Sequence, residues 1–144
     1  MRVGEIMTEG IRIAEPDEKI VHAAKKMRTQ NIGALPVVER GKLIGMLTDR
    51  DIVIRAIGAN KDLSTTNVRD VMSEECFWCA ENEELDDAVR IMEQNKVRRL
   101  PVMSDERDVV GMLSLEDIAV HAPASLTGEV LKAVAIAKGE LATT

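Results

Sequence analysis

Apolar residues recur along the chain at two spacings, and the order of the spacings is the same in both halves. Alternation of apolar and polar residues predicts a short strand over residues 11–14. Spacings of three and four then predict one helix with an apolar face over residues 20–27 and another over 85–92. Asp17 and Asn82 precede these helices and are predicted N-caps, because their short polar side chains can satisfy amides of the first turn.

Each predicted helix is followed by a hairpin and by a second helix. In the first half, apolar runs at 34–38 and 43–47 flank a turn at Gly41, which predicts two antiparallel strands. Thr48 then stands where a helix N-cap is expected, and Ser114 stands there in the second half. Each half therefore has the order strand, helix, strand, strand, helix, and the predicted fold class is α+β.

Three sequence blocks recur in the same order, which indicates an internal duplication. The second copy of each block lies 65 or 66 residues after the first. The one-residue difference falls in the predicted hairpin turn, where an insertion is tolerated. The paired blocks are Val3–Thr8 with Val68–Ser73, Leu35–Val37 with Leu100–Val102, and Gly45–Ile52 with Gly111–Ile118.

The duplication predicts two repeats that pack on each other. One repeat of roughly 55–60 residues buries too little apolar surface to be stable alone. After Pro123, apolar positions at helical spacing predict a final helix. The predicted divisions are a first repeat at 1–60, a polar connector at 61–67, a second repeat at 68–122 and a tail helix within 123–144.

The composition is that of a folded globular protein. Hydrophobic residues make up 45% of the 144 residues and charged residues 31%. The net charge of −6 disfavours generic binding to nucleic acid. No apolar run approaches the roughly 18 residues of a membrane span, so no membrane partner is expected. With only two cysteines the chain is not a disulfide scaffold, and we expect a cytoplasmic protein.

A hydroxyl and a carboxylate stand three residues apart at both predicted helix starts, as Thr48 with Asp51 and as Ser114 with Asp117. Residues three apart share one helix face, so both groups point into the same small volume. A carboxylate there can accept hydrogen bonds from two ribose hydroxyls, and the first-turn amides suit a phosphate oxygen. The same pair is also a common helix capping box that needs no ligand. The residues alone leave both interpretations open.

The repeated blocks together resemble the CBS domain family. The resemblance rests on Val-x-x-Ile-Met-Thr, on the Leu-Pro-Val strand and on Gly-x-x-Ser/Thr-x-x-Asp, and it extends over residues 2–122. The chain is similar to stand-alone bacterial CBS pairs, or Bateman modules, and in particular to mycobacterial hypoxic-response-type proteins. The resemblance implies two tandem β-α-β-β-α repeats packed with pseudo-twofold symmetry through their sheets. It also implies an adenosine-containing ligand (AMP, ADP, ATP, NAD or S-adenosylmethionine) and a homodimer that forms a disc of four repeats.

The resemblance further implies two ligand slots, each shared between the repeats. One repeat supplies the Ser/Thr and Asp of a slot, and the other repeat holds the base. Slot one is then expected to use Ser114 and Asp117 together with Thr8, Ile11, Ile13, Ile32 and Gly33. Slot two is expected to use Thr48, Asp51 and Met46 together with Ser73, Cys76, Trp78, Val97 and Arg98.

Two substitutions make the implied slots unequal. Trp78 has the position in the second repeat that Ile13 has in the first, and it either stacks on a base or fills the slot. Arg98 has the position of Gly33, and it either pairs with a phosphate or collides with the base.

Cys76 and Cys79 form a C-x-x-C motif, which is found in redox sites and in zinc sites. The motif aligns with the predicted strand at 11–14, and residues three apart on a strand point to opposite faces. A closed zinc site needs four ligands. No metal is therefore predicted, although a zinc ion shared between two chains stays open with these two cysteines as the candidate ligands.

Two functional hypotheses follow from the duplicated pattern. The first is a regulatory module that binds an adenine nucleotide. Binding shifts the population of the module's conformations and so acts on an effector protein, which the sequence does not identify. The second is a ligand-free structural or interaction dimer. The sequence contains no catalytic constellation, so we do not expect an enzyme.

Overall fold

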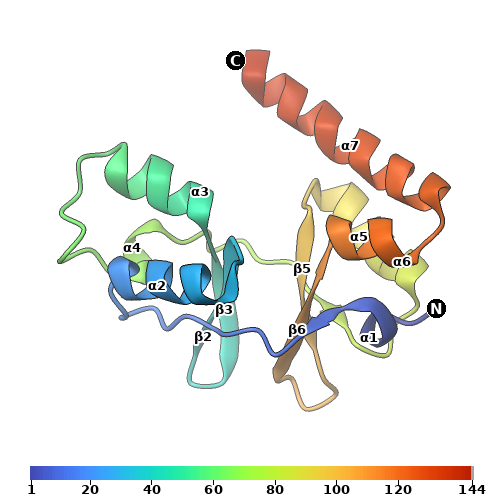
Figure 1. The fold of residues 1–144 in the computed structure, drawn as a ribbon, viewed down its shortest axis with the longest axis horizontal. Helices are drawn as coiled ribbons and strands as arrows, with labels where there is room; N and C mark the ends of the chain where they lie inside the picture. The colour runs from blue at the N-terminus through green and yellow to red at the C-terminus, as the bar shows by residue number, and fades with distance from the viewer. Residues whose placement is uncertain (144) are drawn as a thin grey trace. The chain divides into compact units, whose positions relative to one another are not determined.

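The strands of the chain form two sheets, and each sheet belongs to one of two packing units (Figure 1). The computed structural model describes residues 1–143, with side chains described for residues 1–136. Unit 1 comprises Met1–Gly10 and the chain from Phe77 onward, whereas unit 2 comprises Ile11–Cys76. Each unit therefore contains the hairpin of one repeat together with the opening block of the other repeat.

Unit 2 is built around a two-stranded antiparallel hairpin. Its turn uses Arg40 and Gly41 at φ values of 51° and 79°, a left-handed pair that matches the twist of a tight hairpin. The second helix of this repeat begins as a short α-helix and continues as a π-helix. The elements are α2 (Ile20–Gln30), β2 (Ala34–Glu39), β3 (Lys42–Thr48), α3 (Asp49–Asp51), η1 (Ile52–Ile57) and α4 (Val68–Val71).

Unit 1 contains a four-stranded sheet in the order β1-β6-β5-β4. The β1–β6 and β6–β5 pairs are antiparallel, and β4 runs parallel to β5. The elements are α1 (Val3–Ile6), β1 (Thr8–Glu9), β4 (Cys79–Ala80), α5 (Leu85–Asn95), β5 (Arg99–Met103), β6 (Val109–Ser114), α6 (Leu115–His121) and α7 (Ala124–Thr143). The α+β class and the C-terminal helix are thus confirmed.

The opening block of each repeat pairs with the hairpin of the other repeat. In unit 1, Thr8 lies opposite Met112 on β6 and Glu9 lies opposite Gly111. In unit 2, Ser73 and Met46 exchange two backbone hydrogen bonds of 2.9 and 3.0 Å. This exchange explains why the packing units are offset from the sequence repeats by about ten residues at each boundary.

Two glycines make this strand exchange possible. A Cβ on Gly111 would lie 2.7 Å from the Thr8 carbonyl oxygen, and a Cβ on Gly45 would lie even closer to the Ser73 carbonyl oxygen. Any larger residue would force the crossing backbone away. The Gly of the repeated Gly-Met-Leu sequence therefore serves the approach of the exchanged segment.

Each unit has its own apolar core, and the predicted helix faces are buried in it. In α2 the buried apolar side chains are Ile20, Ala23 and Met27, with Ala24 half-buried, and in α5 the whole predicted face is buried. The core of unit 2 comprises Ala14, Ile20, Ala23, Met27, Leu35, Val37, Leu47, Ala56, Val68, Val71 and Met72. The core of unit 1 comprises Val3, Ile6, Cys79, Leu85, Ala88, Val89, Met92, Leu100, Val102, Leu113, Leu115, Ile118, Val130 and Val134.

The tail helix α7 packs on unit 1 through one edge. Val130 and Val134 are buried in the core of this unit, and Leu126 is partly buried against it. Leu131 points outward and is 43% exposed. The predicted helix after Pro123 is confirmed, and it lengthens the core that α5 and α6 begin.

The prediction that Asp17 caps the first helix is wrong. Helix α2 begins after Lys19, whose side chain makes no capping hydrogen bond. The Ile20 amide instead donates to the Thr66 carbonyl oxygen at 3.0 Å. Asp17 forms an ion pair with Arg69 at 3.5 Å. A backbone carbonyl from the connector thus replaces the local polar cap.

The same correction applies to Asn82 before α5. This helix begins after Glu84, and the Leu85 amide donates to the Met1 carbonyl oxygen at 2.8 Å. The Asn82 amide group donates to Asp105 at 3.2 Å instead. Both helix starts are therefore satisfied by segments that are distant in the sequence, which local patterns do not reveal.

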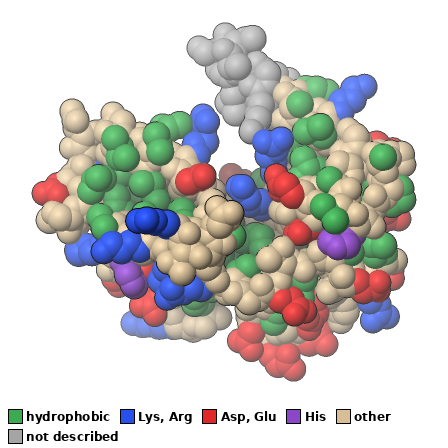
Figure 2. Space-filling model, viewed as in Figure 1, with side chains coloured by type: hydrophobic (Ala, Val, Ile, Leu, Met, Phe, Trp, Pro, Cys, Tyr) green, Lys and Arg blue, Asp and Glu red, His purple; other side chains and the backbone are tan. Residues whose placement is uncertain are grey.

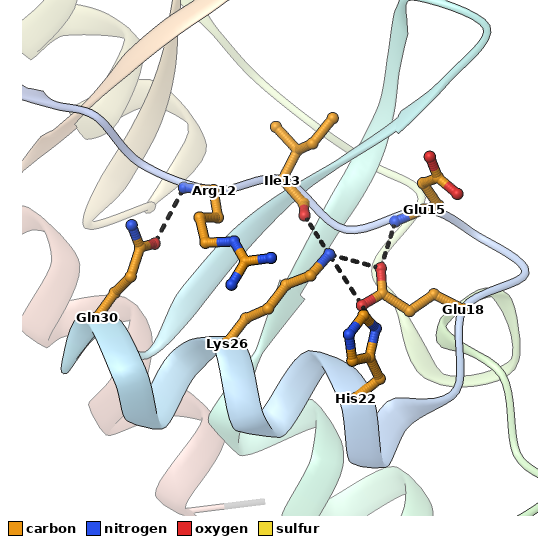
Figure 3. A network of polar contacts seen from close by, with 7 residues as sticks. All are labelled: Arg12, Ile13, Glu15, Glu18, His22, Lys26 and Gln30. Atoms are coloured by element: carbon orange, nitrogen blue, oxygen red, sulfur yellow. Dashed lines mark hydrogen bonds and ion pairs between the residues drawn. The ribbon is translucent and has the colours of Figure 1, made fainter.

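The predicted strand at 11–14 is reduced to a single bridge. Ala14 pairs with Val37 of β2, with hydrogen bonds of 2.8 Å to the Pro36 carbonyl and 2.9 Å from the Val38 amide. Residues 11–13 lie outside the strands. Side chains of α2 and of the turn before it hold the remainder of this segment (Figure 3).

A buried ion pair joins α2 to the turn that precedes it. The Lys26 Nζ lies 2.9 Å from both carboxylate oxygens of Glu18, and His22 Nδ1 lies 2.7 Å from Glu18 Oε2. Burial alone would raise the pKa of the Glu18 carboxyl. This effect of burial is outweighed by hydrogen bonds from the Glu15 amide and from Lys26, and by the positive charges of Lys26 and His22. The pKa of Glu18 therefore lies below its usual 4.5.

We expect Glu18→Gln to destabilise the protein by about 2 kcal/mol at pH 7, because Lys26 stays buried without its counter-charge. A lowered folded-state pKa means that Glu18 stabilises the fold above about pH 4.5 and loses this effect as the pH falls through the folded value. The difference in unfolding free energy between wild type and variant, measured in urea from pH 7 to pH 3, therefore shrinks toward acid. Glu15→Gln, at an exposed side chain, is the control. A difference that does not change with pH would contradict this account.

Candidate functional site

In unit 1, the hydroxyl and carboxylate at the start of α6 form a closed hydrogen-bonded set. The Asp117 amide donates to Ser114 Oγ at 3.2 Å, and the Ser114 amide donates to Asp117 Oδ2 at 2.9 Å. The Ser114 hydroxyl also lies 3.0 Å from Oδ2. Thr8 from the exchanged segment donates to the other carboxylate oxygen, Oδ1, at 3.0 Å. The structure thus brings Thr8, Ser114 and Asp117 together.

In unit 2, Thr48 and Asp51 form the same capping box at the start of α3. The Asp51 amide donates to Thr48 Oγ1 at 3.1 Å, and the Thr48 amide donates to Asp51 Oδ2 at 2.9 Å. Asp51 Oδ1 lies 3.8 Å from Arg55 Nε, and the residue is only 8% exposed. The predicted caps are confirmed in both units, and the partner of the second carboxylate oxygen differs between them.

Gly33 contacts the start of α3 directly. The Asp49 amide donates to the Gly33 carbonyl at 2.9 Å, and a Cβ on Gly33 would lie 2.7 Å from the Asp49 carboxylate. Ile32 precedes it in the turn that ends α2, where its amide donates to the Met27 carbonyl at 3.0 Å. Residues 32–33 therefore lie beside the capping box of their own unit.

Arg98 has the corresponding position in unit 1. Its carbonyl accepts a hydrogen bond of 3.0 Å from the Leu115 amide, as the Gly33 carbonyl does from Asp49. The Arg98 Nε is buried and has no hydrogen-bond partner among the described residues. A buried donor without a partner is costly, so this nitrogen favours the approach of an acceptor.

Trp78 is covered on its ring by Arg107 from the β5–β6 turn. The guanidinium carbon lies 4.9 Å from the ring centroid, within the range of a cation–π contact. The sequence did not reveal this contact, because turn residues carry no periodic pattern. One ring face is therefore already occupied, and a stacked base would need the other face.

The residues of each implied slot are divided between the two units. Slot one takes Thr8, Ser114 and Asp117 from unit 1 and Ile11, Ile13, Ile32 and Gly33 from unit 2. Slot two takes Met46, Thr48, Asp51, Ser73 and Cys76 from unit 2 and Trp78, Val97 and Arg98 from unit 1. Within unit 2 the Met46–Ser73 backbone pair adjoins the β3 end that carries Thr48. The assembly of each set into one slot stays a prediction.

The two cysteines belong to different units. Cys79 is fully buried in the core of unit 1, where burial and, to a smaller extent, the charge of Glu83 raise the pKa of its thiol to about 12. Burial raises the pKa of the Cys76 thiol to about 11. Metal ligands and redox nucleophiles are thiolates, which these raised values disfavour.

The described part of the chain holds no cluster of metal ligands and no helix that could span a membrane. Among these residues, no three His, Cys, Asp or Glu side chains converge as a metal site requires. None of the helices described combines the length and the apolar character needed to cross a lipid bilayer.

The sequence of the chain matches a known domain twice. A model of the CBS domain matches residues 3–58 and again residues 68–123. The chain belongs to the CBS domain family. The matched ranges coincide closely with the duplicated blocks, so the tandem CBS architecture is confirmed.

Two of the curated relatives are stand-alone CBS proteins of similar length. The CBS domain-containing protein YhcV of Bacillus subtilis is 42% identical over 119 residues, which cover 83% of this chain and 84% of YhcV. Hypoxic response protein 1 of Mycobacterium tuberculosis is 35% identical over 131 residues, 90% of this chain and 91% of that protein. The resemblance to hypoxic-response-type proteins is therefore confirmed.

Solved structures of CBS pairs share the fold. The crystal structure of Hypoxic Response Protein I with two coordinated zinc ions has a TM-score of 0.75, covering 85% of this chain and 100% of that one. A CBS domain pair in complex with 5′-methylthioadenosine and S-adenosyl-L-methionine is 30% identical, with a TM-score of 0.73, and covers 83% of this chain and 94% of that one.

We expect the Cys79 thiol to resist alkylation in the native protein. In a Cys76→Ser variant, Cys79 is the only thiol, and its raised pKa and burial slow its reaction with iodoacetamide at pH 8 on the order of 1,000-fold relative to free cysteine. The rate, followed by mass spectrometry, rises to that of free cysteine in denaturant. A native rate within tenfold of free cysteine would show an accessible thiolate and contradict this assignment.

Proposed function

We propose that this protein is a regulatory, ligand-sensing module that binds an adenosine-containing nucleotide of the AMP, ATP or NAD type in slots between its two CBS repeats. The observation that carries the proposal is the hydroxyl–carboxylate pair at the start of α3 and of α6. Both pairs have the same hydrogen-bonded geometry. An aspartate fixed in this way is preorganised to accept hydrogen bonds from the two hydroxyls of a ribose.

The capping bonds leave acceptor capacity on both aspartates. Each carboxylate oxygen can accept about two hydrogen bonds. Asp117 Oδ1 already accepts one from Thr8, whereas Asp51 Oδ1 has only the long contact with Arg55. A ribose would therefore find fewer existing hydrogen bonds on Asp51 Oδ1, although Asp51 is more buried than Asp117, and it would share Asp117 with the Thr8 hydroxyl.

The ligands of a relative support the adenosine class. The CBS pair at 30% identity was solved with 5′-methylthioadenosine and S-adenosyl-L-methionine. Both molecules consist of an adenosine with a substituent at the 5′ carbon. The shared part of these ligands is the purine riboside that slots one and two are proposed to hold.

Slot two is proposed to favour a phosphate on that adenosine. Arg98 brings a positive charge where the first repeat has Gly33, and its buried Nε has no hydrogen-bond partner among the described residues. A phosphate oxygen would satisfy this donor through a charge-assisted hydrogen bond. AMP, ADP, ATP and NAD all supply such an oxygen, whereas 5′-methylthioadenosine does not.

We further propose that the protein is not an enzyme and that it acts as a homodimer with four repeats in one disc, in the cytoplasm, on an effector protein. An apolar surface on the second helix of the first repeat supports the dimer. Val53, Ile54 and Ile57 of η1 are each about half exposed, and Figure 2 shows hydrophobic side chains over this part of unit 2.

The alternative function is a ligand-free structural or interaction dimer, which the same surface would serve.

Zinc is not part of the proposed function, although a relative was solved with two zinc ions. Zinc sites need converging thiolate, imidazole or carboxylate ligands. Cys79 is enclosed in the core of unit 1, and the described residues offer no group of three such ligands. The burial of Cys79 also makes it a poor ligand for a zinc ion shared between two chains.

We expect AMP, ATP or NAD to stabilise the protein and to distinguish its two slots. At 100 times Kd, a single slot contributes about 2.7 kcal/mol, which raises the melting temperature by roughly 5–10 °C. Asp117→Asn and Asp51→Asn keep the caps and remove the charge, so each weakens one slot in calorimetric titration. Glu116→Gln, at an exposed carboxylate on α6, is the matched control.

Trp78 gives an independent signal for slot two. We expect its emission to change with nucleotide in the wild type and in Asp117→Asn, and to change less in Asp51→Asn. If no adenosine compound shifts either the melting temperature or this emission, the ligand-free dimer is the better interpretation. Loss of both slots in either single aspartate variant would contradict the assignment of one aspartate to each slot.

A further inference from the structure

Side chains of unit 2 hold backbone groups of Arg12, Ile13 and Glu15, on either side of the bridge from Ala14 to β2 (Figure 3). The Arg12 amide donates to Gln30 Oε1 at 3.0 Å, and the Glu15 amide donates to Glu18 Oε1 at 2.9 Å. Between them, Lys26 Nζ donates to the Ile13 carbonyl oxygen at 2.9 Å. Three polar side chains thus satisfy backbone groups that a sheet partner would otherwise satisfy.

Lys26 is an unusual choice for this position, because lysine is rarely buried. It is only 9% exposed, and its ammonium group is held by the Ile13 carbonyl and the Glu18 carboxylate. An apolar residue of similar size often stabilises a fold at least as well as a buried ion pair. A buried lysine is therefore better explained by what it positions than by its contribution to stability.

The second repeat shows that the fold does not require these side chains. At the offset of 65 residues, Lys26 corresponds to Ile91 and Gln30 to Asn95. Asn95 donates to the Ile91 carbonyl within its own helix, so it makes no equivalent bond to the chain before α5. Only the glutamate tether is kept, as the hydrogen bond of 3.2 Å from the Ala80 amide to Glu83.

The main-chain pairing of the second repeat extends one residue beyond the position equivalent to Ala14. Cys79 and Ala80 form β4, which pairs in parallel with Val102 and Met103. In the first repeat only Ala14 makes such a bridge, to Val37. The residues equivalent to Arg12 and Ile13, Phe77 and Trp78, lie outside β4, and the Lys26 and Gln30 that hold Arg12 and Ile13 are replaced by Ile91 and Asn95 in the second repeat.

We propose that Lys26 and Gln30 are positioning residues that fix the backbone of Arg12 and Ile13 in the ligand-free protein, and so increase the nucleotide affinity of slot one. This inference rests on the proposed function, which assigns Ile11 and Ile13 to that slot. A segment held in place before binding loses less conformational entropy when the ligand arrives, so affinity rises without a new contact to the ligand. Slot two lacks these tethers and gains nothing from them.

The test exchanges the tethers for the residues of the second repeat. Gln30→Asn and Lys26→Ile are made singly, with Lys25→Ile on an exposed position of α2 as the charge-matched control. Because Lys26→Ile leaves Glu18 buried without its counter-charge, the double variant Lys26→Ile/Glu18→Gln is included. Gln30→Asn leaves the ion pair intact and serves as the mildest variant.

Two readouts separate positioning from general destabilisation. Amide hydrogen exchange without ligand should accelerate about tenfold at Arg12 in Gln30→Asn, because its acceptor is withdrawn. AMP affinity is then measured for slot one in an Asp51→Asn background and for slot two in an Asp117→Asn background. We expect slot one to weaken by about five- to tenfold and slot two to change less than twofold.

Three results would overturn the proposal. Faster exchange at Arg12 with unchanged affinity at slot one would show that the tether does not act on binding. Equal weakening of both slots would show a general loss of structure. A wild type that binds no adenosine compound would overturn the proposed function and the effect on affinity together, while the exchange data would still show whether the tethers hold the segment.

Discussion

The structure depends on the exchange of a short backbone segment between the repeats. Thr8 and Glu9 complete the sheet of unit 1, and Ser73 pairs with Met46 in unit 2. The exchange needs a residue without a side chain on the receiving strand, which Gly111 and Gly45 supply. It also determines which groups meet at the helix starts, because it brings the Thr8 hydroxyl to within 3.0 Å of the Asp117 carboxylate. In unit 1 the hydrogen-bonded set at the helix start is therefore made by both repeats.

Local features of this fold were predictable from the sequence, and features that join distant segments were not. The capping boxes at Thr48 and Ser114 depend on residues three apart, and the structure has both. The starts of α2 and α5 escaped prediction because their partners, the carbonyls of Thr66 and Met1, are main-chain groups 46 and 84 residues away. A carbonyl is present at every residue, so no residue type marks the position where one serves as a cap.

The two copies have kept their hydrophobic pattern while their polar contacts have diverged. The core faces of α2 and α5 occupy the same positions, since packing constrains both. At the helix positions beside these faces, Lys26 is exchanged for Ile91, and the main-chain pairing before the helix is one residue longer in the second repeat than in the first. The sequence shows this difference in residue type, but the bond from the buried lysine to the Ile13 carbonyl is seen only in the structure.

This divergence gives the two proposed slots different physical characters. Slot one combines a tethered backbone with an aspartate that already accepts a bond from Thr8. Slot two combines a less engaged aspartate with a buried arginine nitrogen that lacks an acceptor among the described residues, and with a tryptophan covered by Arg107. Under the proposed function, the tethers would act on the affinity of slot one, and the buried arginine nitrogen would favour a phosphate in slot two. The duplication therefore gives two equivalent positions with different polar contacts, and under the proposed function each position would respond to a different property of the same ligand.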